Sequence, residues 1–284
     1  MSLESVAAVS APISQAARDY LGESLASPQS IAPLPRVCAQ LAELTAQQVT
    51  DSAQLARLIQ SDPALAGEIM RVANSPAWRP RTAMVSLQQA VSWLGVAEVR
   101  NIAMAVMLRG EVFVAPGHEP ESEELWREAW LAGLWAKEIA RERRKHVESA
   151  FLAALMHRTG AALALKILAR FESERRERLD THTFGDLVVE FEPAFGRLLM
   201  NSWLLPKDVQ DGAGDWRNYR ESNHGDLAGT VHAAHLFATH TLNPQLLTEE
   251  LVIDSPVFEK LGVFPDDRRR MLAKRDHVRA LAGM

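Results

Sequence analysis

Several residue types are scarce in this 284-residue sequence, and each scarcity excludes a class of protein. There is one cysteine, Cys38, so no internal disulfide can form and a reducing compartment is expected. Cys38 lies in an apolar stretch with Val37 and Leu41, which favours a small buried thiol over a nucleophile. Acidic residues outnumber basic ones, and the resulting net charge of −5 argues against nucleic acid as a partner.

Common functional motifs are missing as well. The sequence has no G-x-S-x-G elbow, no glycine-rich phosphate loop and no paired cysteines. No apolar run approaches the roughly 20 residues that cross a bilayer, and no Lys or Arg precedes Arg18 as a secretory signal would require. We therefore expect a cytoplasmic protein with no membrane partner and no cofactor.

The residues that are abundant indicate an all-α fold. Ala, Leu, Glu and Arg dominate, whereas strand-forming residues are sparse. Helix stops at Asp51, Ser61, Asn74 and Gly95 divide residues 34–109 into short helices. Short helices joined by abrupt turns form an orthogonal bundle rather than a long coiled coil.

The stretch from Ser61 to Arg109 carries the clearest local signals. Asp62-Pro63 is a strong helix start, because the carboxylate caps free N–H groups and proline loses no hydrogen bond there. Ser86 followed by Gln89 forms a capping box that opens a second helix. Gly95 is placed to end that helix in a left-handed conformation.

Two segments of this stretch, SDPALAGEIMRVANS and SLQQAVSWLGVAEVRNIAMA, resemble the signature of the HDOD family, the HD-related output domain. The Leu34-Pro35 pair upstream fits the same pattern, and the resemblance extends from about Ile31 to His240. It implies an all-helical bacterial protein linked to signal transduction rather than to a known reaction.

Pattern and resemblance together divide the chain into three parts. Residues 1–30 are expected to be a loosely attached lead-in. Residues 31–115 form an orthogonal N-terminal HDOD-type helical bundle, and residues 121–284 form a degenerate HD-like helical bundle with a C-terminal helical appendage. Within the second bundle, Pro193 is expected to separate two helices. In the appendage, Val257, Leu261 and Phe264 are expected to be buried.

The resemblance also locates a vestigial site. Related HD hydrolases hold divalent metals with histidines and aspartates, which activate water beside a phosphate ester. Here Glu128 stands where the first histidine would be, and His157-Arg158 stands where a His-Asp pair would be. Glu192 replaces a further histidine of two-metal members, and His235 replaces the distal aspartate.

Arg158 argues against a metal at these positions. It places a permanent positive charge where a carboxylate should bind the ion. A rearranged site would need His232 and His235 to converge with His157. However, a helical wheel places His235 at the edge of the apolar stripe and His232 well away from it. We therefore expect neither a metal nor a catalytic residue.

The preferred interpretation is a non-enzymatic regulatory protein that binds an unidentified signalling protein, and a homo-oligomer is also compatible with the sequence. An alternative is a sensor of a phosphate-containing small molecule or nucleotide in the former metal pocket, since arginine suits bidentate phosphate contacts. A second alternative is a metal-dependent phosphohydrolase with an atypical ligand set.

Overall fold

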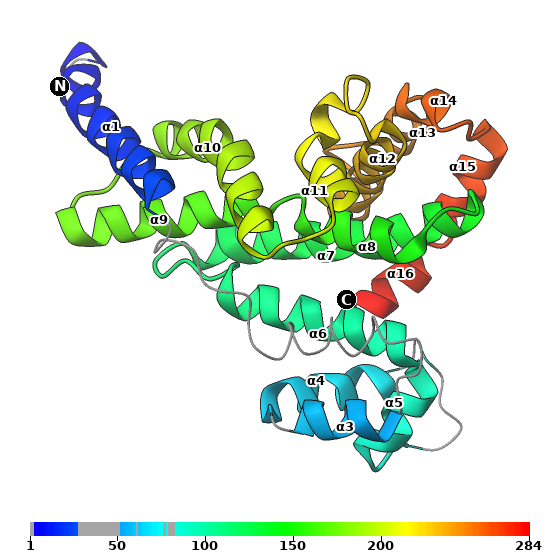
Figure 1. The fold of residues 1–284 in the computed structure, drawn as a ribbon. Helices are drawn as coiled ribbons and strands as arrows, with labels where there is room; N and C mark the ends of the chain where they lie inside the picture. The colour runs from blue at the N-terminus through cyan, green and yellow to red at the C-terminus, as the bar shows by residue number, and fades with distance from the viewer. Residues whose placement is uncertain (1–2, 28–51, 61, 76–77, 79–82) are drawn as a thin grey trace.

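The computed structural model describes residues 3–27, 52–60, 62–75, 78 and 83–284. Across this part of the chain the regular elements are all helices, with no strand, so the prediction of an all-α fold is confirmed (Figure 1). Cys38 and the Leu34-Pro35 pair lie outside the described residues, and the expectation of a buried thiol remains a prediction.

The N-terminal bundle is built from short helices around its own apolar core. These helices are α3 (Ser52–Gln60), α4 (Pro63–Ala73), α5 (Leu87–Leu94) and α6 (Val96–Glu111). The axes of α5 and α6 differ by 110°, which confirms the orthogonal arrangement. Fully buried Leu55, Ile69 and Val99 belong to this core.

The predicted capping residues shape these turns. Asp62 Oδ1 accepts a hydrogen bond from Leu65 N at 3.1 Å, and Ser86 Oγ accepts one from Gln89 N at 3.2 Å. Gly95 has the expected positive φ of 83°, although its ψ of 157° is extended rather than left-handed helical. Asn74 does more than stop a helix, because its side chain accepts from Met84 N at 2.7 Å and donates to Met84 O at 3.2 Å.

The second bundle surrounds the long helix α7 (Glu119–Glu142). Its other helices are α8 (Val147–Met156), α9 (Thr159–Arg175), α10 (Thr181–Ser202), α11 (Lys207–Gly214), the 3-10 turn η2 (Trp216–Asn218) and α12 (Gly225–Leu242). The buried Trp135 of α7 donates to Thr241 Oγ1 of α12 at 3.0 Å, and its ring packs edge-on against Phe237 at 4.9 Å. Helices α7 and α12 therefore form the centre of this bundle.

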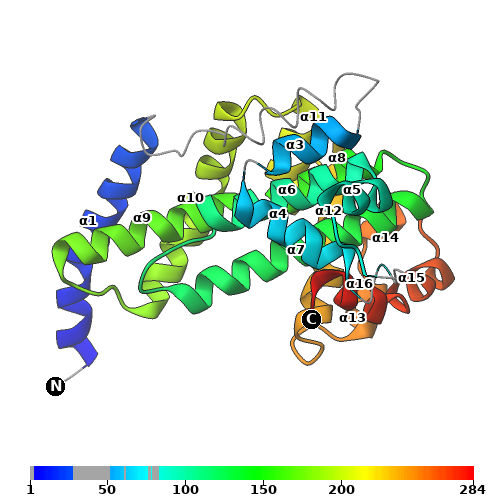
Figure 2. The same cartoon turned by 90° about the horizontal axis from the view of Figure 1, so that it is seen from below.

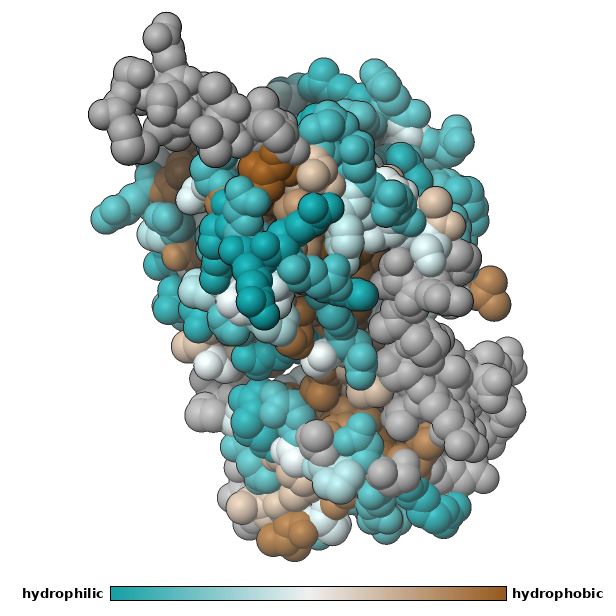
Figure 3. Space-filling view, turned by 90° about the vertical axis from the view of Figure 1, so that its left-hand side faces the viewer, coloured by the Kyte–Doolittle hydropathy of each residue, from teal (hydrophilic) through white to brown (hydrophobic). Residues whose placement is uncertain are grey.

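Helix α6 is shared by the two cores. Its residues Ile102 and Ala103 belong to the N-terminal core, whereas Ala105 and Leu108 belong to the core of the second bundle. A mostly buried ion pair between Glu98 of α6 and Lys137 of α7 adds a polar tie between them. Figure 3 shows hydrophobic residues gathered where the N-terminal bundle, at the bottom of that view, meets the rest of the molecule.

The N-terminal lead-in differs from the sequence-based expectation. Helix α1 (Leu3–Ala26) is 24 residues long and packs across α9 and α10 (Figure 2). Ala17 and Leu21 are fully buried in the second core, and Arg18 pairs with Glu190 at 2.7 Å. The alanine-rich composition looked like a loose segment, but small side chains allow close helix packing.

Two expectations for the second bundle were wrong. Pro193 lies inside the continuous helix α10, because buried side chains before and after it, including Val188 and Phe195, hold the helix against its neighbours. In the appendage, Phe264 is 73% exposed, although Val257 and Leu261 are buried as predicted.

The appendage comprises the last four helices. They are α13 (Glu249–Ile253), α14 (Val257–Lys260), α15 (Pro265–Leu272) and α16 (Arg275–Ala282). The buried Arg268 anchors α15, since it donates to Ile253 O at 2.7 Å and Val263 O at 2.8 Å. The buried contacts of Arg268, rather than burial of Phe264, therefore hold α15 in place.

Within the described residues, one stretch, Val147–Arg175, is long and apolar enough to cross a membrane by length and composition, which corrects the expectation that no apolar run approaches that length. It comprises α8 and α9, and 83% of its apolar window is buried inside the protein. This burial is what a core helix of a folded bundle would show. The expectation of no membrane partner remains a prediction.

Candidate functional site

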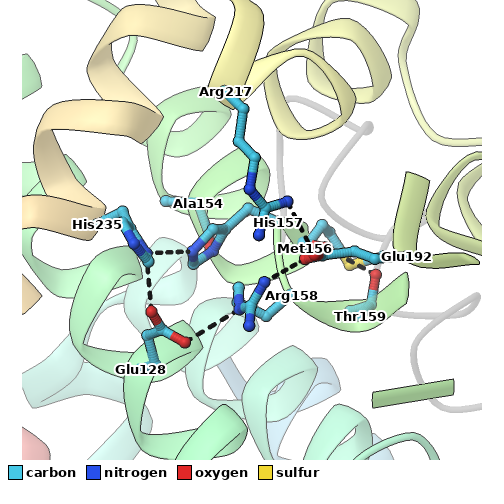
Figure 4. A network of polar contacts seen from close by, with 9 residues as sticks. All are labelled: Glu128, Ala154, Met156, His157, Arg158, Thr159, Glu192, Arg217 and His235. Carbon is cyan, nitrogen blue, oxygen red and sulfur yellow. Dashed lines mark hydrogen bonds and ion pairs between the residues drawn. The ribbon is translucent and has the colours of Figure 1, made fainter. Parts of the chain in front are cut away.

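The candidate site is a buried polar cluster where four segments of the second bundle meet (Figure 4). Glu128 comes from the middle of α7, Glu192 from α10 and His235 from α12. His157 and Arg158 form the short break between α8 and α9. The structure therefore brings together all five residues that the sequence identified as a vestigial pocket.

The charged groups form an alternating chain of acids and bases. Arg158 Nε donates to Glu128 Oε2 at 3.0 Å, while its Nη1 donates to Glu192 Oε1. Arg217 Nη1 then lies 2.8 Å from Glu192 Oε2. That last contact is an ion pair without good hydrogen-bond geometry. Two carboxylates are thus balanced by two guanidinium groups within the protein.

Arg217 was missed by the sequence analysis. It lies in η2, between the helices that carry Glu192 and His235, and its guanidinium rests 4.2 Å from the ring centroid of Trp216. The Trp216 ring also lies against both histidines, with centroid distances of 4.3 Å to His235 and 5.1 Å to His157. No spacing in the sequence indicates that this turn covers the site.

The surrounding residues stabilise the charged forms of Glu128 and Arg158. Burial alone would raise the pKa of Glu128, but the hydrogen bond from His235 and the positive charge of Arg158 outweigh it and hold that pKa well below its usual range. Burial likewise tends to lower the pKa of Arg158, whereas the charges of Glu128 and Glu192 raise it above its ordinary value. Both groups are therefore ionised at neutral pH.

The two histidines fit a single proton arrangement. His157 Nδ1 lies 2.5 Å from Ala154 O, a carbonyl that can only accept, so Nδ1 carries the proton. Complete burial, followed by the neighbouring His235, lowers the pKa of His157 well below its usual value, which keeps it neutral. His235 Nδ1 then donates to Glu128 Oε1 at 2.9 Å and faces His157 Nε2 at 3.2 Å.

These contacts partly overturn the expectation about a rearranged site. His235 does reach His157 from the edge of its helical stripe. His232 does not join them, because its Nδ1 lies 3.1 Å from Trp216 O. Burial and the nearby His235 lower the pKa of His232 to about 4. The converging set is therefore His157, His235 and Glu128.

This converging set is the strongest candidate for a metal site among the described residues. One ligand atom from each of Glu128, His157 and His235 lies within 4.8 Å of the others. However, the His235 nitrogen in this group carries the proton that it donates to Glu128, and the other carboxylate oxygen already binds Arg158. A divalent ion would have to displace that proton and face a fixed guanidinium. As arranged, these donors are already engaged with groups of the protein itself.

Close packing at Gly160 positions Glu192. A Cβ atom built on Gly160 would lie 1.9 Å from Glu192 O and 2.7 Å from Gly196 N. Any side chain at this position would collide with the backbone of α10. Glycine therefore lets the start of α9 approach α10 closely enough for Glu192 to reach Arg158.

A pocket of about 640 Å³ opens beside this cluster, between α7, α9, α10 and α12. Glu128 and Arg158 belong to its lining, together with apolar residues such as Leu125 and Phe184. Its charged lining contains four glutamates, including Glu172, but only the arginines Arg158 and Arg178. The pocket is therefore acidic, although Arg158 is part of its lining.

Several solved structures have a similar fold. A protein from Shewanella amazonensis SB2B, provisionally named a metal-dependent phosphohydrolase, superimposes with a TM-score of 0.69 at 23% identity, over 89% of this chain and 92% of that one. An HDOD domain protein of unknown function from Geobacter sulfurreducens gives a TM-score of 0.67 at 16% identity, over 93% and 98%. A protein from Marinobacter aquaeolei VT8, provisionally named a signal transduction protein, gives 0.64 at 20% identity, over 95% and 66%.

Two matches in sequence add to these similarities in fold. An uncharacterized protein of Treponema pallidum (strain Nichols) is 21% identical over 187 residues, which cover 62% of this chain. The chain spans only 36% of the length of that relative. The HDOD domain family itself matches residues 31–214, beginning where the motif resemblance begins and ending short of His240. Since this match covers well over half of the sequence, the chain belongs to the HDOD family.

Proposed function

We propose that this protein is a non-enzymatic regulator in bacterial signal transduction that works by binding another protein. The observation that carries the proposal is the mostly buried guanidinium of Arg158, which lies between Glu128 and Glu192. Metal-dependent hydrolysis needs carboxylates and imidazoles that are free to hold an ion and lower the pKa of its water. Here an internal cation already neutralises those carboxylates.

A metal-dependent phosphohydrolase is the second candidate. It is favoured by the convergence of Glu128, His157 and His235, and by the provisional name of the similar protein from Shewanella amazonensis. Against it stands the cost of placing a divalent ion near Arg158, whose side chain is only 14% exposed. Charges in such a poorly solvated place are weakly screened, so the repulsion is large.

A phosphate or nucleotide sensor is less well supported by the same pocket. Arg158 is the feature that would attract an anion, but its Nε and Nη1 already donate to two carboxylates. Glu121 and Glu124 add negative charge around the pocket. An anionic ligand would therefore enter against the local potential.

Two assays on the full chain test the proposal. Purified protein would be given bis(p-nitrophenyl) phosphate with Mn²⁺, Fe²⁺ or Mg²⁺, and we expect the same background rate as for the Glu128→Gln variant. In the second assay, chemical cross-linking in the native cell should yield a specific protein complex. Metal-dependent turnover that disappears in both Glu128→Gln and His157→Gln would overturn the proposal in favour of the hydrolase.

A further inference from the structure

The pocket beside Arg158 has apolar walls contributed by four helices and by the link between α9 and α10. They are formed by Leu125, Leu165, Leu179, Phe184, Val188 and Leu242. Its volume of about 640 Å³ exceeds what a single side chain occupies and lies in the range typical of ligand sites. The pocket can therefore take several apolar groups at once.

The mouth of this pocket exposes large apolar side chains. Val189 of α10 is 60% exposed, and Leu246, which follows α12, is 71% exposed. Single exposed apolar residues are ordinary on a protein surface, but here two of them line one concave site. A small ligand inside the pocket would leave these side chains in water. The backbone and side chains of a docked polypeptide would cover them.

Negative charge is available around the same pocket. Glu128 and Glu172 are already paired, the first with Arg158 and the second with His118 at 2.8 Å and Arg178 at 3.4 Å. Glu124, in contrast, is exposed and has no ion pair among the described residues.

Glu121 is also available, since within the described part of the chain its one ion pair is a 3.9 Å contact with His118. It lies in the first turn of α7, where the helix dipole accounts for an acidic residue. Glu124 lies beyond that turn, so the dipole does not explain it. The unpaired charge that a ligand meets is thus negative.

One polar atom in the wall lacks a protein partner. Thr239 lines the pocket, and its buried Oγ1 makes no hydrogen bond within the described part of the chain. A hydroxyl can donate or accept, so it suits the backbone amide groups of an incoming segment. Satisfying a buried polar atom of this kind favours binding.

We propose that this pocket docks a segment of the partner protein in which apolar side chains are flanked by lysine or arginine. The apolar side chains fill the cavity and cover Val189 and Leu246, while the basic residues face Glu121 and Glu124. This inference rests on the proposed function, since it names the chemistry of the partner. It places the binding surface on the second bundle, next to the charge-balanced cluster.

Site-specific photo-cross-linking in the native cell tests the proposal. The photoreactive amino acid p-benzoylphenylalanine would replace Val189 in the full chain, and in separate controls it would replace Trp93 or Phe264. Trp93 and Phe264 are 48% and 73% exposed on other surfaces. We expect a cross-linked partner from position 189, with mass spectrometry locating the link in a segment that has basic residues beside apolar ones.

A charge reversal makes the test specific. In the position 189 protein, Glu124→Lys should lower the cross-link yield by about tenfold, because like charges would then face each other. The matched control is Glu259→Lys, an exposed glutamate of α14, which should leave the yield unchanged. Equal yields from both variants would overturn the inference, as would a link to an acidic segment.

The remaining outcomes separate this inference from the proposed function. If Trp93 or Phe264 captures a partner and position 189 does not, the docking site is wrong but the binding function stands. If no position and no general cross-linker yields a complex, both are overturned. A small amine that copurifies and is displaced by Glu124→Lys would replace the protein segment as the occupant.

Discussion

Arg158 Nε donates to Glu128 Oε2 at 3.0 Å, and this bond joins a residue of the α8–α9 break to the central helix α7. The same guanidinium also binds Glu192 of α10. One side chain thus ties three segments of the second bundle together. It also supplies the positive charge that two buried carboxylates require.

Removing this charge should destabilise the fold. Arg158→Met keeps much of the apolar stem but leaves Glu128 and Glu192 without their shared cation. Breaking a buried ion pair from one side costs about 3–5 kcal/mol. We expect a loss of that size in the unfolding free energy, measured by urea denaturation followed by circular dichroism.

Two further variants test whether the loss of the Arg158 charge and of its hydrogen bonds causes this destabilisation. Arg158→Lys keeps the charge but cannot donate to both carboxylates in the planar geometry of arginine, so we expect a smaller loss of about 1–3 kcal/mol. Arg127→Met removes a 55% exposed arginine from α7 and should change stability by less than about 1 kcal/mol. A neutral effect of Arg158→Met would mean that the cluster does not stabilise the fold.

Gly160 is predicted to tolerate no side chain. In Gly160→Ala the new methyl group would lie 1.9 Å from Glu192 O, so α9 and α10 must move apart. Overpacking of this kind costs about 1–3 kcal/mol, and the shift should also weaken the Arg158–Glu192 pair. The readouts are a urea unfolding curve and the chemical shifts of a ¹³C-labelled Arg158 guanidinium.

The matched control is Gly185→Ala, another glycine of a long helix. Nothing lies within 4 Å of a Cβ atom at Gly185. Alanine there should stabilise the protein by about 0.5–1 kcal/mol through its higher helix propensity. If Gly160→Ala behaved like Gly185→Ala, close packing would not be what positions Glu192.

Stability should fall as the pH is lowered from 7 to 5. Burial lowers the pKa of His232 to about 4 and that of His157 well below its ordinary value, so both are neutral when folded. The unfolded chain takes up these protons below about pH 6.5. The native state therefore keeps full stability above that pH and loses it as the pH falls towards the folded pKa values.

For His232 alone the expected loss at pH 5 is about 2 kcal/mol. Urea unfolding at pH 7, 6 and 5 measures the decline, and the His232→Gln variant should show a shallower one. The pKa of Glu128 is lowered instead, so its contribution is complete above the ordinary value of 4.5 and is lost as the pH falls below it. An unchanged slope in His232→Gln would show that folding does not lower the pKa of this histidine.

The fold and part of the site could be predicted because their signals are local. Asp62, Ser86 and Gly95 determine helix ends by their own capping and backbone preferences, and the structure shows them in those roles. The arginine at position 158, where the motif of related HD hydrolases has aspartate, could be identified because it lies inside a recognisable motif. Its charge alone indicated that a metal would be disfavoured.

Other features depend on packing between distant segments, which local patterns do not report. Pro193 suggested a helix end, yet tertiary packing carries α10 through it. Arg217 and Trp216 reach the cluster from a short 3-10 turn without any motif. His235 sits at the edge of its apolar stripe, and its convergence with His157 depends on how α12 crosses the α8–α9 break.

The most direct measurement is the metal content of the full chain after anaerobic incubation with Mn²⁺, Fe²⁺ or Zn²⁺ and removal of unbound ions. If Arg158 fills the role of a cation in this cluster, elemental analysis should find far less than one ion per chain, and the same amount in Glu128→Gln. About one ion per chain, lost in both Glu128→Gln and His157→Gln, would contradict this role for Arg158 and identify a working metal site.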